Sequence, residues 1–289
     1  MGYLVAASLS EALEALGQPD AAVIAGGTDW FPAQGQRPFK GDLVDITRLP
    51  ELRGITRDTD DKGGWRIGGA TTWTDVIRAD LPPAFDGLKA AAREVGSIQI
   101  QNAGTIAGNL CNASPAADGV PPLLTLGALV ELASTAGTRR MGLSEFLKGP
   151  RQTARMPGEV LTALIIPDLP AGAQGAFLKL GARHYLVISI AMVAALVTVR
   201  DGSITQAAVA VGSCAATAQR LPALETALTG QAVQTVLAAG PALIAPDHLA
   251  PLSPIGDVRG SADYRMEAAA TLCARALRMA IEQGEQTHG

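Results

Sequence analysis

Residues 104–118 read GTIAGNLCNASPAAD, and the rest of the chain is organised around this stretch. Gly104 and Gly108 let the backbone turn and approach another group closely, because glycine has no Cβ. The polar side chains that follow are all short, and the stretch lacks the aromatic or arginine anchors of a typical protein-binding loop. The pattern favours a loop that cradles a small polar ligand. A plain turn-rich connection between two strands is the alternative.

A second glycine stretch reads VIAGGTD at residues 23–29. A short strand, a tight glycine turn and N-cap residues leave backbone N–H groups pointing outward, where they suit phosphate oxygens. Neither glycine stretch fits a GxGxxG or a GxxxxGK[ST] fingerprint. A Rossmann domain and a P-loop NTPase are therefore disfavoured.

The composition indicates a globular protein of two domains. The chain has 289 residues, of which 48% are hydrophobic and 17% charged. Its net charge of −4 argues against a nucleic-acid partner, which would need a basic surface. No apolar run reaches the ~18 residues of a membrane span. The N-terminus shows no secretory signal, so a cytoplasmic location is expected.

The cysteines and histidines predict neither a disulfide framework nor a metal site. Cys111, Cys214 and Cys273 are odd in number and far apart, as expected for reduced cytosolic thiols. They also exclude an iron–sulfur cluster held by this chain alone, since a cluster usually takes four thiolates. The three histidines have no metal-ligand spacing.

Local patterns place the expected helices and strands. Asp201-Gly202 predicts a hairpin turn, and Pro121 and Pro122 suit the first turn of a helix. Helices are expected over residues 8–16, 72–78, 85–95, 142–146, 221–229, 231–239 and 261–283. Strands are expected over residues 21–25, 43–46, 65–67, 128–133, 160–166, 175–180, 188–200 and 203–212.

The segment DLPAGAQG at residues 168–175 is the best linker in the chain, because it is rich in glycine, proline and alanine. It divides the sequence into domains at residues 1–168 and 175–289. The second domain places strands before helices, which is an α+β order.

Two stretches carry a family resemblance: AGGTDW at residues 25–30 and TIAGNLCNASPAAD at residues 105–118. Together they resemble the FAD-binding (medium) subunit of the molybdenum hydroxylases, the xanthine dehydrogenase and carbon monoxide dehydrogenase family. The sequence also resembles this family at residues 149–164, 177–194 and 253–265, so the resemblance covers nearly the whole chain. It implies an α+β fold: a two-lobed, PCMH-like FAD-binding domain, then a smaller domain of antiparallel sheet and helical bundle. Both glycine loops would converge on the FAD pyrophosphate and ribityl chain.

The resemblance also implies site residues, each with a structural alternative. Asp118 would hydrogen-bond the ribityl hydroxyls, or cap a helix. Ile165 and Lys179 would lie at the flavin end, or Lys179 would be a solvated strand lysine. Trp30 would follow the first loop, or pack in the core. The family's more usual TxGGN has a glycine where this chain has Ala107, which is tolerable if φ is negative there. The implied FAD contacts are Ile24, Ala25, Gly26, Gly27, Thr28, Asp29, Trp30, Gly104, Thr105, Gly108, Asn109, Cys111, Asp118, Ile165 and Lys179.

The segment RHYLVIS at residues 183–189 would meet the flavin ring and the electron acceptor. Family members that use NAD often carry an acidic residue early in this segment, whereas this chain has His184, Tyr185 and Ser189. The sequence therefore does not decide whether the electron acceptor is NAD, a quinone, oxygen or another protein. Tyr185 would shield a flavin face or anchor the sheet.

The sequence shows no nucleophile next to a base and no general-acid pair. We therefore expect a bound cofactor to carry the chemistry and no side chain to be catalytic. The resemblance implies an electron-transfer subunit of a heterotrimeric oxidoreductase. Electrons would pass from molybdopterin on a large partner chain, through iron–sulfur clusters on a small partner, to FAD here and on to an acceptor such as NAD. The alternatives are a self-contained FAD-dependent oxidoreductase and a flavin-free assembly module.

Overall fold

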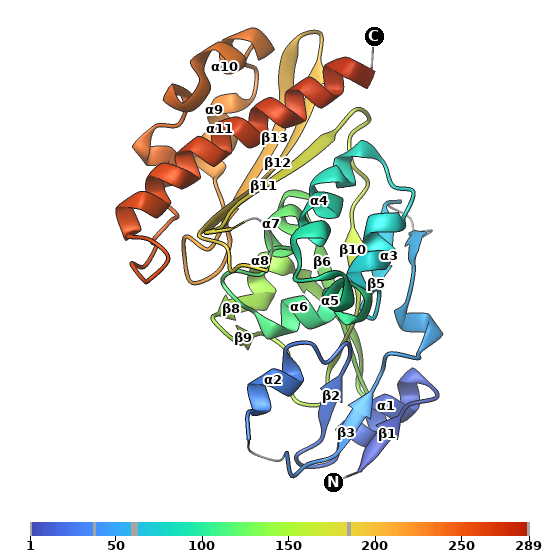
Figure 1. Ribbon diagram of the computed structural model, residues 1–289. Helices are drawn as coiled ribbons and strands as arrows, with labels where there is room; N and C mark the ends of the chain where they lie inside the picture. Colours follow the sequence, from blue (N-terminus) through green and yellow to red (C-terminus); the bar gives the residue numbers. More distant parts are fainter. Residues whose placement is uncertain (1, 37–38, 59–62, 184–185, 288–289) are drawn as a thin grey trace. The chain divides into compact units, whose positions relative to one another are not determined.

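The computed structural model describes residues 2–36, 39–58, 63–183 and 186–287. The chain forms two compact units, and each is assembled from three separate segments of the sequence. Unit 1 comprises residues 1–79, 98–113 and 128–168, and unit 2 comprises residues 80–97, 114–127 and 169–289. No helix among the described residues is long and apolar enough to cross a membrane. The mixture of helices and sheets confirms the expected α+β class (Figure 1).

Unit 1 begins with a parallel three-stranded sheet in the order β1-β3-β2, with β1 at Tyr3–Val5, β3 at Leu43–Asp45 and β2 at Ala22–Ile24. Helix α1 (Leu9–Leu16) contributes Ala12, Leu13 and Leu16 to the core that it shares with β3. The Ser8 hydroxyl caps this helix by accepting from the Glu11 N–H. The capping residue and the apolar spacing together explain why this helix was predictable.

A five-stranded antiparallel sheet forms the rest of the unit 1 framework, in the order β4-β5-β10-β6-β7. Its central strand, β10 (Val160–Ile166), is buried along its whole length. The other strands are β4 (Ile55–Arg57), β5 (Trp65–Gly68), β6 (Leu129–Ser134) and β7 (Gly137–Gly142). The smaller elements are α2 (Trp30–Gln34), α3 (Trp73–Arg78), α8 (Leu143–Phe146), β8 (Leu147–Gly149) and β9 (Gln152–Thr153).

The interpretation of residues 104–118 as one loop is wrong. Helix α5 (Ile98–Ala103) precedes Gly104, and helix α6 (Ile106–Asn112) occupies the middle of the stretch. Thr105 caps α6 by accepting from the Gly108 N–H at 3.1 Å. Ile106, Ala107 and Leu110 form the buried side of the helix. The glycine and asparagine content obscured this short helix, whose stability depends on packing rather than propensity.

Unit 2 is built on an antiparallel sheet in the order β11-β12-β13-β14, with β11 at Gln174–Leu180, β12 at Ala191–Arg200, β13 at Ser203–Gly212 and β14 at Gln219–Arg220. Asp201 and Gly202 both have positive φ, as expected for the turn of the β12–β13 hairpin. Strand β12 is apolar along nearly its whole length because helices cover both faces of the sheet.

One face of this sheet packs against α11 (Ala262–Thr287), with Val193 and Ala195 of β12 in the shared core (Figure 1). Met192 and Ala194 point to the other face, against α4 (Asp86–Glu94). Helix α7 (Val120–Thr125) carries the two prolines at its start, as expected, and also contacts β12. Helices α9 (Pro222–Leu228) and α10 (Val233–Ala239) complete the unit.

Candidate functional site

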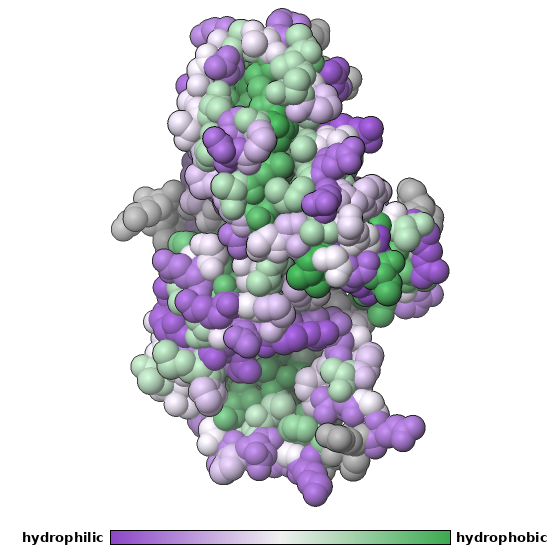
Figure 2. All heavy atoms as spheres, turned by 90° about the vertical axis from the view of Figure 1, so that its left-hand side faces the viewer, coloured by the Kyte–Doolittle hydropathy of each residue, from purple (hydrophilic) through white to green (hydrophobic). Residues whose placement is uncertain are grey.

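The glycine loop at residues 25–29 follows β2 in unit 1. Gly27 has φ +69°, a conformation that side chains other than glycine rarely adopt. A Cβ added at Gly26 would lie 1.9 Å from the carbonyl oxygen of Ala103 and 2.9 Å from the Cα of Gly104. The two glycine stretches of the sequence therefore lie against one another, backbone to backbone. Figure 2 shows a hollow with an apolar floor at the height of β2 and α2 in Figure 1.

The loop presents a row of backbone donors. Within the described part of the chain, no group accepts a hydrogen bond from the N–H of Gly26, Gly27, Thr28 or Asp29. On α6, the side-chain Oδ1 of Asn109 is also buried without a partner among the described residues. A buried side-chain oxygen without a partner is rare in folded proteins. The N–H groups belong to half-buried residues and to exposed Asp29, so they are accessible to a ligand or to water. The donors suit phosphate oxygens.

Around the loop, Ile24 is buried at the end of β2, and Asp29 is exposed. Trp30 begins α2, is half-buried, and makes edge-to-face contacts with Phe31 and Phe39.

Helix α6 carries Gly108, Asn109 and Cys111, and its N-cap residue directly follows Gly104, which lies against the loop. Ala107 has negative φ within the helix, so its methyl group is accommodated where the family usually has glycine. Burial raises the pKa of the Cys111 thiol to about 11. The thiol is thus protonated at neutral pH and is a poor nucleophile for linking a cofactor covalently.

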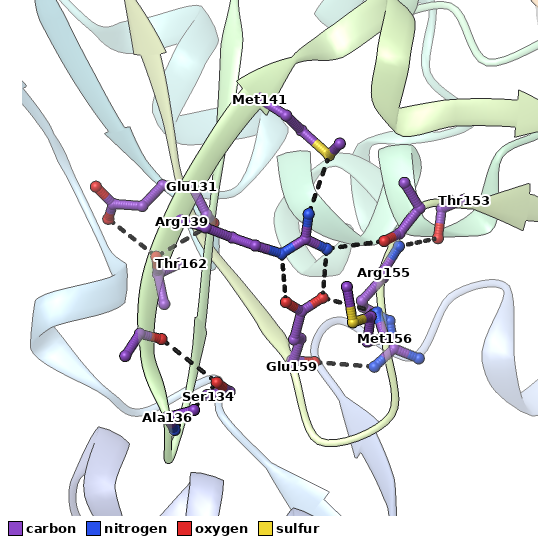
Figure 3. A network of polar contacts seen from close by, with 12 residues as sticks. Glu131, Ser134, Ala136, Arg139, Met141, Thr153, Arg155, Met156, Glu159 and Thr162 are labelled. Atoms are coloured by element: carbon purple, nitrogen blue, oxygen red, sulfur yellow. Dashed lines mark hydrogen bonds and ion pairs between the residues drawn. The ribbon is translucent and has the colours of Figure 1, made fainter.

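The C-terminal end of α6 is held by Arg151. Its backbone N–H donates to the carbonyl of Ala113 at 2.9 Å, and its guanidinium donates to the Asn112 side chain. The segment that follows Arg151 is in turn tied to β7 by a bidentate pair between Arg139 and Glu159, at 2.6 and 2.9 Å (Figure 3).

Hydrogen bonding to Arg139 is the largest cause of the lowered pKa of the Glu159 carboxyl. Arg139 also donates to the Ala154 carbonyl at 2.9 Å, and the Met156 N–H donates to Glu159 (Figure 3). No role was predicted from the sequence for Arg139, or for Ala154, Met156 and Glu159 in the family-like segment at residues 149–164.

Unit 2 holds a second group of the expected site residues. Lys179 donates to Asp118 Oδ2 at 2.8 Å, and Ser189 donates to Asp118 Oδ1 at 2.7 Å. Lys179 also donates to the carbonyl of Glu94 at 3.3 Å. Burial raises the pKa of the Asp118 carboxyl, and the contacts with Lys179 and Ser189 offset part of that rise.

Both structural alternatives for this pair are wrong. The Lys179 side chain is 7% exposed, so it is not a solvated strand lysine. Gly119, not Asp118, is the N-cap of α7. Of the remaining expected residues, Ile165 is buried on β10 in unit 1, and His184 and Tyr185 lie outside the described residues. The described residues contain no group of three side chains suited to a metal ion.

The comparison with known families covers both halves of the chain. Residues 1–169 match the family described as the FAD binding domain in molybdopterin dehydrogenase, and residues 176–280 match the CO dehydrogenase flavoprotein C-terminal domain. The chain belongs to the FAD-binding (medium) subunits of the molybdenum hydroxylase family.

Members of this family that resemble the chain are subunits of larger dehydrogenases. The 6-hydroxypseudooxynicotine dehydrogenase complex subunit alpha of Paenarthrobacter nicotinovorans is 32% identical over 291 residues, covering 99% of this chain and 96% of its own. The glyceraldehyde dehydrogenase medium chain of Sulfolobus acidocaldarius is 30% identical, covering 96% of each chain. A structure of carbon monoxide dehydrogenase from Hydrogenophaga pseudoflava gives a TM-score of 0.87 at 30% identity, covering 98% of this chain and 97% of that one.

The residues of this molybdenum hydroxylase subunit fit FAD. The unpaired N–H groups at residues 26–29 and the orphaned Asn109 oxygen offer donors and an acceptor on adjoining parts of unit 1. Sequence reasoning identified both segments from their glycines. Phe31 and the Arg139–Glu159 pair could not be found from the sequence, because a single aromatic residue and an ion pair between residues 20 positions apart carry no signal of their own.

Proposed function

We propose that this chain is the electron-transfer subunit of a molybdenum hydroxylase. The main observation in support of this proposal is the row of unpaired backbone donors at residues 26–29, which lies within the part of the chain that matches the FAD-binding domain family. FAD supplies the redox chemistry, because a flavin accepts electrons singly and releases them as a pair. The chain's own residues bind and orient the cofactor.

In this proposal the pyrophosphate is held by the backbone of residues 25–29 and by the segment at Gly104, Thr105, Gly108 and Asn109. Ile24, Trp30, Cys111 and Ile165 belong to the same unit 1 site, and Asp118 and Lys179 of unit 2 contact the cofactor as well. The binding is noncovalent, supported by the raised pKa of the Cys111 thiol. The sequence-level domains are residues 1–168 and 175–289.

The partners we propose are a large molybdopterin-binding chain and a small iron–sulfur chain, as in the xanthine dehydrogenase type. Relatives named as medium chains or complex subunits support this arrangement. The acceptor is NAD in this proposal, with a quinone, oxygen or a protein as the other outcomes. The free cysteines fit a reducing cytoplasm.

The deciding experiment compares the lone chain with the co-expressed complex. Both are assayed with a panel of heterocycles and aldehydes and an artificial acceptor. We expect the lone chain to be yellow but inert and the complex to turn over substrate. Acid precipitation should release all the flavin. Turnover by the lone chain would favour a self-contained oxidoreductase, and a colourless chain that still assembles would favour a flavin-free module.

A further inference from the structure

Phe31 is an exposed aromatic residue beside the glycine loop. It is 56% exposed, although exposing a phenylalanine ring to water is unfavourable. A Cβ added at Gly27 would lie 2.8 Å from Cε2 of this ring and 2.9 Å from Cδ2. The ring edge therefore lies directly over Gly27, next to the unpaired N–H groups.

Two further rings hold Phe31 in place. Trp30 and Phe31 are edge to face, with centroids 5.1 Å apart and planes at 88°. Trp30 makes a similar contact with Phe39, at 5.3 Å and 79°. The Phe31 N–H donates to the Gly27 carbonyl at 3.1 Å, so helix α2 and the loop are joined through the backbone as well. These contacts join the exposed ring both to α2 and to the glycine loop.

We propose that Phe31, supported by Trp30, packs against the adenosine half of FAD and makes this chain select FAD over FMN. This inference rests on the proposed function, because it requires the pyrophosphate to bind at residues 26–29. In FAD a single ribose separates the pyrophosphate from the adenine, so a ring that touches Gly27 is within reach of the adenosine. Purines stack on aromatic side chains, and FMN has no purine.

The alternative occupant is a partner protein that covers Phe31. The row of unpaired donors next to the ring favours the nucleotide, because successive backbone N–H groups suit the oxygens of a phosphate. Exposed aromatic residues also act as anchors in protein interfaces, so the test separates the two occupants.

The test uses the full-length chain after its flavin has been removed, titrated separately with FAD, FMN and ADP by calorimetry. Phe31→Ala should weaken FAD and ADP by the same factor, about 10- to 100-fold, and leave FMN unchanged. Phe31→Tyr should restore both affinities, because it keeps the ring. Tyr264→Ala removes an exposed aromatic residue from α11 in unit 2 and should change none of the three affinities.

An equal loss for FAD and FMN in Phe31→Ala would overturn the inference, since the ring would then act on the shared flavin half. Unchanged FAD affinity with impaired assembly of the co-expressed complex would also overturn it, in favour of a partner protein. Failure of the proposed function would look different, because the wild-type chain would then bind none of the three ligands.

Discussion

The glycine loop of unit 1 and the Asp118–Lys179 pair of unit 2 are expected to serve one cofactor, yet they are built in opposite ways. The loop offers backbone donors that have no acceptor among the described residues, and glycines set its shape. The pair consists of buried side chains, and both carboxylate oxygens of Asp118 already have partners. A site built from backbone groups places few demands on side chains, but the positions in closest contact must be glycine. A buried ion pair tolerates backbone variation but not the loss of one partner.

The largest effect is expected from Gly26→Ala, which tests the backbone cradle. Its Cβ would lie 1.9 Å from the Ala103 carbonyl oxygen, so the loop must move away from α5. We expect FAD affinity to fall roughly 100-fold or more, as for other misplaced binding groups. Flavin absorbance of the purified chain and a binding titration measure this.

Gly142→Ala is the matched control, because a Cβ there meets nothing closer than 3.8 Å. It should retain FAD. If Gly26→Ala kept stoichiometric FAD, residues 25–29 would not be the pyrophosphate loop.

The next effect is expected from Lys179→Met, which tests the ion pair. The substitution leaves the Asp118 carboxylate buried without its charged partner, which typically costs about 3–5 kcal/mol of unfolding free energy. Chemical denaturation near neutral pH measures this loss. Lys148→Met, at an exposed lysine on β8, should change stability by less than about 0.5 kcal/mol.

The same variant should show a characteristic pH dependence. Burial already raises the pKa of Asp118, and Lys179 lowers it, so removing Lys179 raises the pKa further. The folded state then binds more protons than the unfolded state, and stability falls as pH rises from the unfolded value, about 3.9, through the folded one. The loss relative to wild type should be smaller at pH 4 than at pH 8. An equal loss at both would mean that Asp118 is not ionised in the folded protein.

The smallest effect is expected from Ala107→Gly, which restores the family's usual glycine. Ala107 has helical φ in α6, so its methyl group imposes no strain on the loop. FAD affinity should stay unchanged, and stability should fall by about 1 kcal/mol because glycine is a poor helix former. Thermal unfolding and a FAD titration measure the two quantities. A marked gain in FAD affinity would show that the methyl group does intrude on the cofactor.

Much of the secondary structure could be predicted because its signals are local. Ser8 and Thr72 cap their helices through groups three residues away, and Asp201-Gly202 supplies both positive φ values of its hairpin. Helix α6 could not be predicted, since its glycine and asparagine residues resemble a loop and only burial of one side stabilises it.

The sequence by itself determined where the glycines stand, and with them the family and the expected FAD loops. Only the tertiary structure decided that Gly26 lies on the Ala103 carbonyl, that the Phe31 ring covers Gly27, and that Lys179 is neutralised by Asp118 across 61 residues. A turn or a helix cap depends on residues a few positions away, so it can be recognised from a local sequence pattern. A buried pair or a fixed ring depends on how distant segments pack, and packing follows from the whole chain at once.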